Sequence, residues 1–444
     1  MKWLDRALDG LSSRTWTLTN PAERWLQRTY AGKTVTVSSA LGLAPFYRGV
    51  QLLSGSVGMM PCKVYRDVTA EQSSMSTRKF NVWLSVQRET GRLAGHASPA
   101  DLQRGRVEAG RRSRAWQLLH DRPNPTMAAD EFWALLESHI DTWGNAYALK
   151  DWGPNTTDGI DALWPIDPCR VQVGRLDDGS GKRFYVLDGD MANPATDNDI
   201  LHIRGLSSDG LVGYSPVALH RQSLGGAMAR DEFTGRFWDN DSTPGITLMH
   251  PGKLSPEAID RVKAKWEHHH KGPRNARKVA VLAENMSIQQ MTMPLRDAQY
   301  IEGQQMDATT QALILGIPPY MVGGLMSGSL TYSTTEAQSL DLLKWSLSPR
   351  LVRLQNAVTW DPDLMPRSWF AEFETGAIMR ATTKERYEAW SIAPHLTVNE
   401  MREMDNLPPI DGGDELSKSM PAAPADPAVM VGDKPSGGNS NDKP

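Results

Sequence analysis

The stretch LLHDRPNPTMAADEFWALLESHIDTWGNAYALKDW, residues 118–152, predicts three kinds of local structure in succession. Its Pro123-Asn124-Pro125 run is typical of a turn, because proline fixes φ and asparagine can bond to its own backbone. A capped helix is expected from about Ala128, and Gly144 separates it from a strand. Helix and strand in one short segment indicate an α+β fold, and the flanking sequence continues this mixture.

The sequence before this stretch predicts another helix and strand. Four apolar side chains recur at helical spacing, and the pattern ends at Pro61. They are Phe46, Val50, Leu53 and Val57. A short strand is expected at 63–66, whereas residues 67–113 are polar, mixed in charge and weakly periodic. We interpret residues 67–113 as an insertion or a mobile excursion.

The sequence after this stretch predicts several strands. Residues 161–189 indicate strands joined by a tight Asp-Gly hairpin, and DILHIRG, residues 199–205, indicates another. Within the hairpin, Gly174 and Gly179 have the glycine spacing of a P-loop, but Ser180 stands where a P-loop needs lysine. Because a strand rather than a helix is expected next, the hairpin interpretation is preferred to a nucleotide site.

A helix is expected over residues 215–240, with Ser215 as its N-cap and Pro216 in its first turn. Gly225 and Gly226 lie inside this helix, each at a cost of about 1 kcal/mol relative to alanine. Such a cost is easiest to explain where another element must approach closely. We therefore expect this helix to pack against a neighbour.

A small mixed unit and two further helices are expected downstream. Residues 241–295 carry strand patterns on either side of a helical segment. A helix over 297–316 ends at a glycine, and a long amphipathic helix over 335–358 is expected to kink at Pro349. Residues 417–444 are rich in proline, glycine and alanine, so we expect them to be disordered.

The composition fits a soluble globular protein of two to four domains, with 444 residues, 40% hydrophobic and 23% charged. Cys62 and Cys169 cannot form a disulfide scaffold, lie in strand-like apolar contexts and are expected to be inert in a reducing compartment. No apolar run has the length of a signal peptide or a membrane helix, so we expect no membrane association.

The formal net charge of -4 argues against a protein that binds nucleic acid over its whole surface. Two local basic clusters, at 104–114 and 261–278, are most simply solvated faces. His268–His270 cannot converge on one metal, because adjacent helical residues point about 100° apart. With no nucleophile elbow, HExxH or CxxC motif, we expect no catalytic, metal or cofactor site, and favour binding and assembly over enzymatic activity.

Taken in order, several segments resemble the portal proteins of tailed double-stranded-DNA bacteriophages, the head-tail connectors of the lambda-like long-tailed branch. The 118–152 stretch is the most specific, and the ordered set covers roughly residues 36–360. The other segments are SALGLAPFYRGVQLLSGSVGMMPCKVYR, ALWPIDPCRVQV, DILHIRGLSSDGLVGYSPV, KVAVLAENMSIQQM, ILGIPPYMVGG and LTYSTTEAQSL. One departure is residues 67–113, which are longer than the family pattern.

The resemblance implies an L-shaped subunit with wing, stem, clip and crown regions, assembled into a ring of typically twelve. Mapped by position, the regions are an N-terminal arm (1–23), the wing (24–214, with insertion 67–113), stem helix 1 (215–240), the clip, a small α/β unit (241–295), stem helix 2 (296–317), a tunnel loop (318–334), a wing helix and return (335–379), a helical crown (380–416) and a disordered tail (417–444).

The stretch VGGLMSGSLTYSTTEAQSL, residues 322–340, is longer than the 2–8 residues that an interhelix turn needs and nearly uncharged. By itself it also fits a disordered surface loop, but the resemblance implies a loop that faces DNA in a channel. Glycine supplies flexibility and hydroxyls make exchangeable hydrogen bonds, whereas a lysine-lined bore would hold phosphates tightly. The residues assigned to this contact are Gly323, Gly324, Ser327, Gly328, Ser329, Thr331, Tyr332 and Ser333.

The resemblance further implies a virion structural protein, assembled in the host cytoplasm, through which double-stranded DNA is packaged and ejected. Its implied partners are other copies of itself, the DNA, the terminase large subunit, the major capsid and scaffold proteins, and the neck and head-completion proteins. Gly225 and Gly226 would let stem helices of adjacent subunits approach. The basic clip face of Arg261, Lys263 and Lys265 would form a cationic band or bind an acidic partner.

Two alternatives from other classes remain at this point. One is a hydrolase or nuclease that uses the histidine cluster or carboxylates, which would lose turnover when His268–His270 are replaced by alanine. The other is a monomeric nucleic-acid-binding module, which would show strongly salt-dependent affinity and no ring.

Overall fold

A computed structural model describes residues 29–89, 105–154, 159–176, 181–239, 246–249, 252, 255–270, 287–290, 297–324, 340–375, 397–404, 408 and 410–413. The chain divides into two compact units, residues 1–379 and 380–444. The described part has no helix long and apolar enough to span a bilayer.

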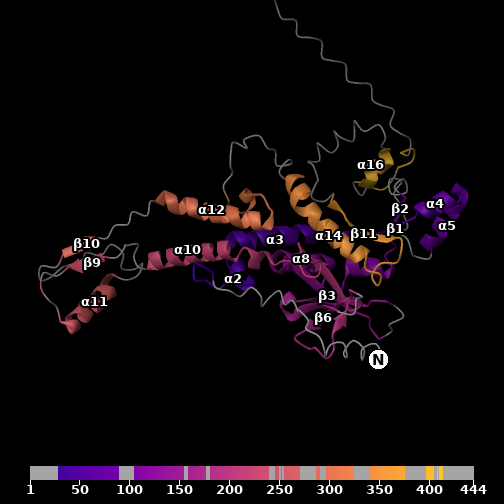
Figure 1. Cartoon of the computed structure of the whole chain (residues 1–444). Coiled ribbons are helices and arrows are strands. Elements are labelled where there is room, and N and C mark those ends of the chain that lie inside the picture. The colour runs from indigo at the N-terminus through magenta and orange to yellow at the C-terminus, as the bar shows by residue number, and fades with distance from the viewer. Residues whose placement is uncertain are drawn as a thin grey trace, which may run out of the picture. The chain divides into compact units, whose positions relative to one another are not determined.

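Two helices, α3 (Ala44–Gly58) and α8 (Ala129–Trp143), pack side by side at the centre of the first unit (Figure 1). The four apolar side chains predicted to line one face of α3 are buried, which confirms that prediction. A Cβ on Gly58 would lie 2.7 Å from the Asp130 carbonyl oxygen, so glycine permits this close approach. The short helix α2 (Val37–Leu41) precedes α3 and is capped by Thr36.

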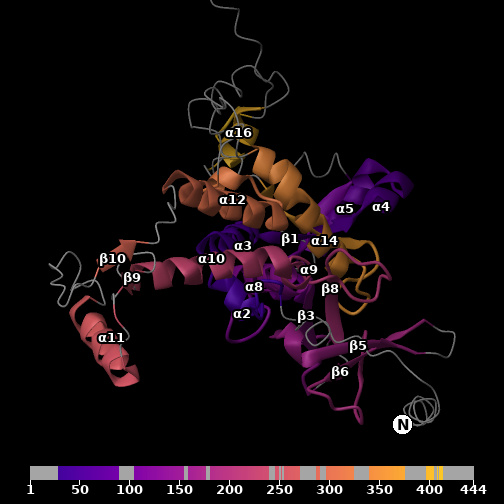
Figure 2. The ribbon, with the colours of Figure 1, turned by 60° about the vertical axis from the view of Figure 1, so that its left-hand side comes forward.

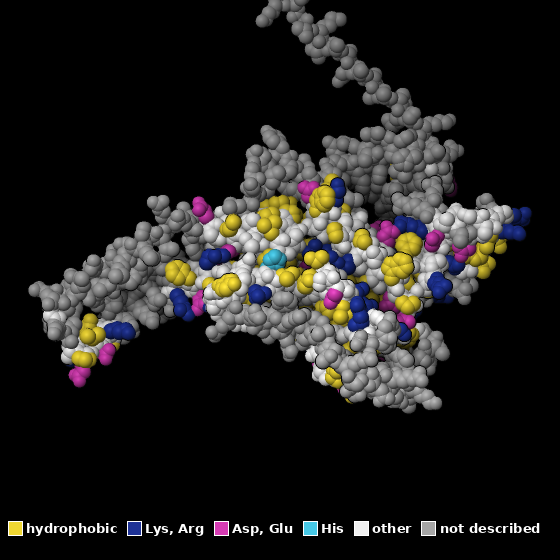
Figure 3. Space-filling view, in the orientation of Figure 1, with side chains coloured by type: hydrophobic (Ala, Val, Ile, Leu, Met, Phe, Trp, Pro, Cys, Tyr) yellow, Lys and Arg dark blue, Asp and Glu magenta, His cyan; other side chains and the backbone are white. Residues whose placement is uncertain are grey.

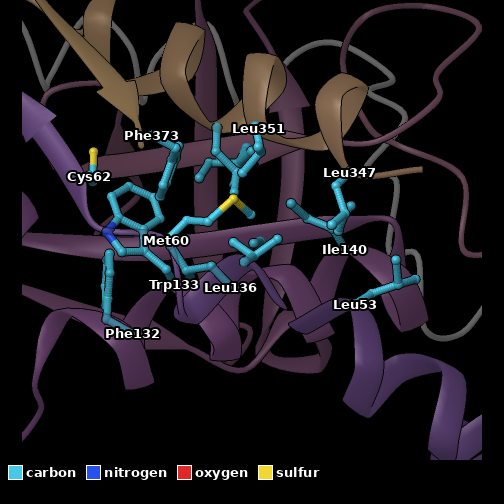
Figure 4. Close-up of a cluster of buried hydrophobic side chains, with 14 of the residues drawn as sticks. Leu53, Met60, Cys62, Phe132, Trp133, Leu136, Ile140, Leu347, Leu351 and Phe373 are labelled. Carbon is cyan, nitrogen blue, oxygen red and sulfur yellow. The ribbon is translucent and has the colours of Figure 1, made fainter. Parts of the chain in front are cut away.

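The core continues from these helices to α14 (Ser348–Thr359) and strand β11 (Trp369–Phe373) (Figure 4). The Trp133 and Phe373 rings meet edge to face at 5.1 Å, and the Trp133 indole N–H donates to the Leu119 carbonyl at 3.0 Å. Leu351 of α14 points into the same cluster as Met60. This packing joins segments more than 200 residues apart and fixes α8 in place.

The 118–152 stretch adopts the predicted turn, helix and strand. A short helix α7 (Arg114–Trp116) leads into the π-helical η1 (Gln117–Asp121), and a turn at 123–127 leads into α8. Gly144 ends α8 with φ 74°. A Cβ at this position would collide with the Tyr214 carbonyl, so only glycine fits here. Strand β3 (Asn145–Asp151) follows directly.

Two antiparallel three-stranded sheets lie beyond α8, in the orders β4-β3-β8 and β5-β6-β7. Their strands are β4 (Ala162–Ile166), β5 (Val171–Arg175), β6 (Arg183–Leu187), β7 (Ala195–Thr196) and β8 (Ile200–Arg204), with the 3-10 turn η3 (Pro168–Arg170) before β5. Tyr147 of β3 and Tyr185 of β6 are buried, and their rings are in contact where the two sheets meet. Because β6 is a strand paired with β5, the hairpin interpretation of residues 174–182 is supported over a P-loop.

Residues 67–113 are predicted to be an insertion or a mobile excursion, but the described part of them instead forms regular elements packed into the fold, so the second alternative is wrong there. The described part forms helices α4 (Thr69–Ser74) and α5 (Thr77–Glu89) and strand β2 (Arg106–Glu108), which pairs with β1 (Cys62–Asp67) in a sheet of order β11-β1-β2. Phe80 and Leu84 of α5 are buried with Val107 of β2. Because these helices are short and bury few side chains, their periodicity is weak in the sequence. Residues 90–104 lie outside the described part.

The helix predicted over 215–240 is present but interrupted at His220, giving α9 (Pro216–Leu219) and α10 (Arg221–Asp239). Ser215 caps α9 as predicted, since its hydroxyl accepts from the Ala218 N–H at 3.2 Å. The second long helix, α12 (Asp297–Leu315), also lies where predicted. An ion pair between Arg230 and Asp307 joins α10 to α12.

The small mixed unit within 241–295 contains strand β9 (Ile246–Met249), helix α11 (Pro256–His270) and strand β10 (Ser287–Gln290). Strands β9 and β10 pair antiparallel. The strand expected near 278–283 lies outside the described residues.

The helix after the 325–339 loop is irregular where the sequence predicts a kink. Its first turns are π-helical (η5, Leu342–Leu347) and become α-helical as α14 begins, with Pro349 in the first turn. Because proline lacks an N–H, it cannot continue the hydrogen-bond ladder, and the wider π-turns accommodate it.

In the second unit, the described residues contain helix α16 (Val398–Met404), within the segment predicted to be helical. Asn399 closes the following turn, accepting from the Ile410 N–H at 2.8 Å and donating to its carbonyl at 3.0 Å. Residues 1–28, 376–396 and the predicted tail 417–444 are outside the described part.

Candidate functional site at the base of the 325–339 loop

The loop that the sequence assigns to a DNA channel leaves the end of α12 through a compact corner. Gly316 has φ 67° and ends α12, and the 3-10 turn η4 (Pro319–Val322) follows. Gly323 has φ 85°, and a Cβ on Gly324 would lie 2.7 Å from the Pro319 Cβ. Both glycines are thus required by the corner itself. Ser327, Gly328, Ser329, Thr331, Tyr332 and Ser333 lie outside the described residues.

The two ends of this loop are held together by hydrogen bonds. The chain re-enters the described part at Leu340 and continues into η5. The Ser346 hydroxyl donates to the Gly316 carbonyl at 2.6 Å, and the Arg350 guanidinium donates to the Leu315 carbonyl at 2.8 Å. The carbonyls at the end of α12 therefore accept hydrogen bonds from side chains of the helix that follows the loop. These bonds hold the two ends of residues 325–339 together.

Arg350 also joins these ends to the central helix α8. Its Nε lies 2.8 Å from the Glu137 carboxylate, and its Nη2 donates to the Asp141 carboxylate at 2.9 Å. Its Nη1 donates to the Ser346 carbonyl at 2.9 Å. One partly buried side chain thus connects three helices at the base of the loop.

The Glu137 and Asp141 carboxyls are buried together, one turn apart on α8. Burial and the nearby Asp141 raise the pKa of Glu137 to about 8, while Arg350 opposes this rise. Burial also raises the pKa of Asp141. Near pH 7 the Glu137 carboxyl therefore keeps its proton, while the neighbouring Arg350 favours the ionised form of both carboxyls.

This arrangement predicts a pH dependence of stability. Between its ordinary value of 4.5 and about 8, Glu137 keeps its proton in the folded state but loses it when unfolded. Raising the pH through this window therefore lowers stability. Glu137→Gln, which stays neutral, should raise the free energy of unfolding at pH 9 by about 1–3 kcal/mol relative to wild type, with little change at pH 5. Urea unfolding at both pH values checks this, and equal differences at the two would contradict it.

The two helix glycines differ in what they contact. A Cβ on Gly225 would lie 2.7 Å from the Thr29 methyl group, so this glycine admits a segment of its own chain. The Tyr30 N–H donates to Gln222 of the same helix at 3.0 Å, and Lys33 pairs with Glu232. The neighbour expected for Gly225 therefore exists within the subunit. Among the described residues, a Cβ on Gly226 would meet only the far end of the Arg230 side chain, at 3.8 Å.

The residues predicted to form a basic face on α11 are partly described. Arg261 and Lys263 are exposed, and the Arg261 Nε donates to the Glu257 carbonyl at 3.3 Å. The side chains of Lys265 and His268–His270 lie outside the described residues. Over the face shown in Figure 3, Lys and Arg side chains alternate with Asp and Glu rather than forming one basic patch.

The basic cluster at 104–114 is a solvated face as predicted at Arg111, Arg112 and Arg114, which are exposed, but the prediction is wrong for Arg106, whose side chain is largely covered. Arg106 pairs with Glu372 and lies over the Tyr65 ring at 4.3 Å. Arg114 donates to the Ile160 carbonyl at 2.8 Å and pairs with Asp161. These arginines join distant segments of the chain.

The prediction for the cysteines holds for Cys62 only. Cys62 is buried, and burial raises the pKa of its thiol. Cys169 lies in the turn η3 and is exposed, so its predicted strand-like apolar context is wrong. Partial burial and Asp167 raise the pKa of this thiol to about 11, so it stays a protonated thiol at neutral pH.

The sequence interpretation missed the Arg350 cluster. The signal that could have identified it is Glu137 and Asp141, two carboxylates four residues apart on the apolar face of α8. Buried carboxylates need a cationic partner. No local pattern identifies that partner, because Arg350 lies 209 residues from Asp141 in the chain.

Comparison with known proteins identifies the family. The family described as "Phage portal protein" matches residues 85–406. The chain is 27% identical to the probable portal protein of Streptomyces phage phiC31, over 92% of this chain and 84% of that one. It is 28% identical to the portal protein of Enterobacteria phage HK97, over 67% and 70%.

A solved structure shares the fold. It is a chain from the neck of a native gene transfer agent particle, computed with C12 symmetry, with a TM-score of 0.54 and 18% identity. The match covers 91% of this chain and 99% of that chain. These findings support neither the hydrolase nor the monomeric alternative. The chain belongs to the phage portal protein family.

Proposed function

We propose that this chain forms a twelve-membered ring at one vertex of a phage capsid, through which double-stranded DNA is packaged and later ejected. The observation that carries the proposal is the family match, which spans most of the chain from α5 to α16. The fold shared with a chain of a C12-symmetric neck supports a ring. A closed ring requires two different, complementary faces on each subunit.

The tunnel loop within 318–334 is proposed to line the bore. Its corner is held by Gly323, Gly324 and the hydrogen bonds to Leu315 and Gly316, which would keep a projecting loop at a fixed radius. Duplex DNA carries one charge per about 1.7 Å of axis, so a bore that lets it slide must avoid dense cationic contact. A loop of glycine, serine and threonine meets this need, because its hydroxyls make weak hydrogen bonds that exchange with water.

The other regions keep the assignments that the sequence suggests. Helices α10 and α12 would be the paired stem helices, and the β9–α11–β10 unit the clip, whose Arg261, Lys263 and Lys265 would contact an acidic partner or DNA. Gly226, open on its own subunit, would face an adjacent one, whereas Gly225 is occupied by Thr29. The wing would be the part around α3 and α8, and α16 part of the crown.

The proposed partners follow from this position in the particle. The clip would bind the terminase large subunit during packaging and the neck and head-completion proteins afterwards. The wing would contact the major capsid and scaffold proteins during assembly in the host cytoplasm. The chain itself would be structural, with ATP hydrolysis supplied by the terminase.

Electron microscopy of the purified full-length chain tests this proposal. Negatively stained preparations should contain annular particles with a central hole and a uniform subunit number. A chain that stays monomeric over a wide range of concentration, salt and magnesium would contradict the proposal.

A further inference from the structure

A cavity of about 570 Å³ lies between strand β8 and helix α14, away from the loop base described above. Figure 2 shows α14 beside β8, and the two elements are in contact. All five residues of β8 line one wall, and the opposite wall includes Arg353, Asn356, Ala357 and Trp360. Trp360 is 81% exposed, although an indole of this size is usually largely covered. The volume is within the range of ligand pockets.

Three arginines line this cavity, and their charges are only partly balanced. Arg183 pairs with Asp197 at 2.8 Å, yet its Nη1 is buried with no hydrogen-bond partner. Arg204 donates to the Gly210 carbonyl. Within the described residues, neither Arg204 nor Arg353 forms an ion pair. Burial and the neighbouring charge of Arg183 lower the pKa of Arg204, which indicates that these cations repel one another.

Nearby carboxylates do not supply the missing negative charge. Asp361 lines the cavity but pairs at 2.7 Å with the buried Lys150, which also contacts Asp363 at 3.0 Å. The Glu137 and Asp141 carboxyls are both in contact with Arg350, and within the described residues neither forms an ion pair with Arg353. Counting Lys150 with the three arginines, four positive charges face the three carboxylates of Asp197, Asp361 and Asp363, so one positive charge is left in surplus beside the exposed Trp360.

The strand that forms the wall has an unpaired edge. Within the part of the chain that the structure describes, strand β8 pairs only with β3. The bonds from the Lys150 N–H to the Asp199 carbonyl and from the Gly205 N–H to the Gly144 carbonyl show that the odd-numbered residues direct their backbone groups toward β3. By this alternation, the backbone groups of His202 and Arg204 point away from β3. Such an edge can pair with an extended peptide.

We propose that this cavity binds a short extended segment of another protein that carries an Asp or Glu next to an apolar residue. The carboxylate would lie between Arg204 and Arg353, since guanidinium groups bind carboxylates through paired charged hydrogen bonds. The apolar neighbour would pack on Trp360, and backbone groups of the segment would pair with the edge of β8. The small volume and partly apolar walls fit a peptide better than duplex DNA. None of its lining residues belongs to the proposed tunnel loop, and the proposal does not depend on a ring.

Selection from a peptide-display library tests the proposal. The library is screened against the full chain, with the double variant Arg204→Ala/Arg353→Ala as counter-selection. Selected peptides should share an acidic residue beside an apolar one. In fluorescence anisotropy, the dissociation constant of such a peptide should rise at least about tenfold for the double variant and for the peptide with its acid changed to the amide.

Controls separate this site from general charge effects. Arg112→Ala, an exposed arginine outside the cavity, should leave affinity unchanged, and Trp360→Ala should weaken it several-fold. Arg353→Gln alone gives a second test if the Arg204 change prevents folding, because Arg353 makes no ion pair in the described part. No enrichment over the double variant, or affinity that the variants leave unchanged, would overturn the proposal. Displacement of the peptide by duplex DNA at equal affinity would instead indicate a nucleic-acid site and also overturn it.

Discussion

Replacing Arg350 with methionine should lower the free energy of unfolding by about 3–5 kcal/mol, because it removes the one cationic side chain of the described part that contacts the buried Glu137 and Asp141 carboxyls. The Asp141 carboxylate would lose its 2.9 Å hydrogen bond, and Glu137 its contact at 2.8 Å. The Leu315 carbonyl at the end of α12 would also lose its donor. Methionine preserves most of the side-chain volume, so the effect would report charge and hydrogen bonding rather than a cavity.

The matched control for this change is Arg353→Met, one turn further along α14. Arg353 makes no ion pair within the described residues, so its loss should cost less than about 1 kcal/mol. Denaturant unfolding of both variants at pH 7 measures the difference. If the two substitutions destabilise the protein equally, or if Arg350→Met costs less than 1 kcal/mol, the Arg350 cluster does not hold the three helices together.

Changing Ser327, Ser329 and Thr331 together to lysine should leave ring assembly intact and reduce the yield of DNA-filled heads roughly tenfold or more. Each subunit would add three positive charges to the bore, and the ring would multiply them. Phosphates passing this collar would then be bound at many points at once, and each contact would have to break for DNA to advance. The effect should weaken as salt concentration rises, because counterions compete for the phosphates.

Two controls isolate the charge from the shape of the loop. Alanine at the same three positions removes the hydroxyls without adding charge, and should reduce packaging far less. Lysine at three exposed sites on α5, away from the loop base, should leave packaging normal. Packaging efficiency is measured as the fraction of DNA-filled heads. Normal filling with the loop lysines would show that these residues do not line the bore.

Much of the fold could be predicted from the sequence because many segments carry strong local signals. The spacing of Phe46, Val50, Leu53 and Val57 identified α3, and the Ser215 cap and the glycine at 144 fixed element boundaries that the structure reproduces. These features act within one or two helical turns, so they are visible in a short window of sequence.

The features that the sequence did not reveal depend on contacts between distant segments. Strand β2 is three residues long and is recognisable only by its pairing with β1, and Arg106 is structural only because Glu372 lies beside it. Gly225 was expected to face a neighbouring element, but nothing local identifies Thr29 as that element. The contact of the tunnel loop with DNA remains a proposal that rests on the family and on the corner at Gly323 and Gly324.

A cryo-electron-microscopy map of the purified ring, with a small gold label on a cysteine introduced at Ser327 in a Cys169→Ser background that lacks the exposed native thiol, tests the central claim most directly. The account predicts label density inside the channel, at or near its narrowest radius, in every subunit. Label density on the outer circumference of the ring, or at the interface between subunits away from the axis, would contradict it.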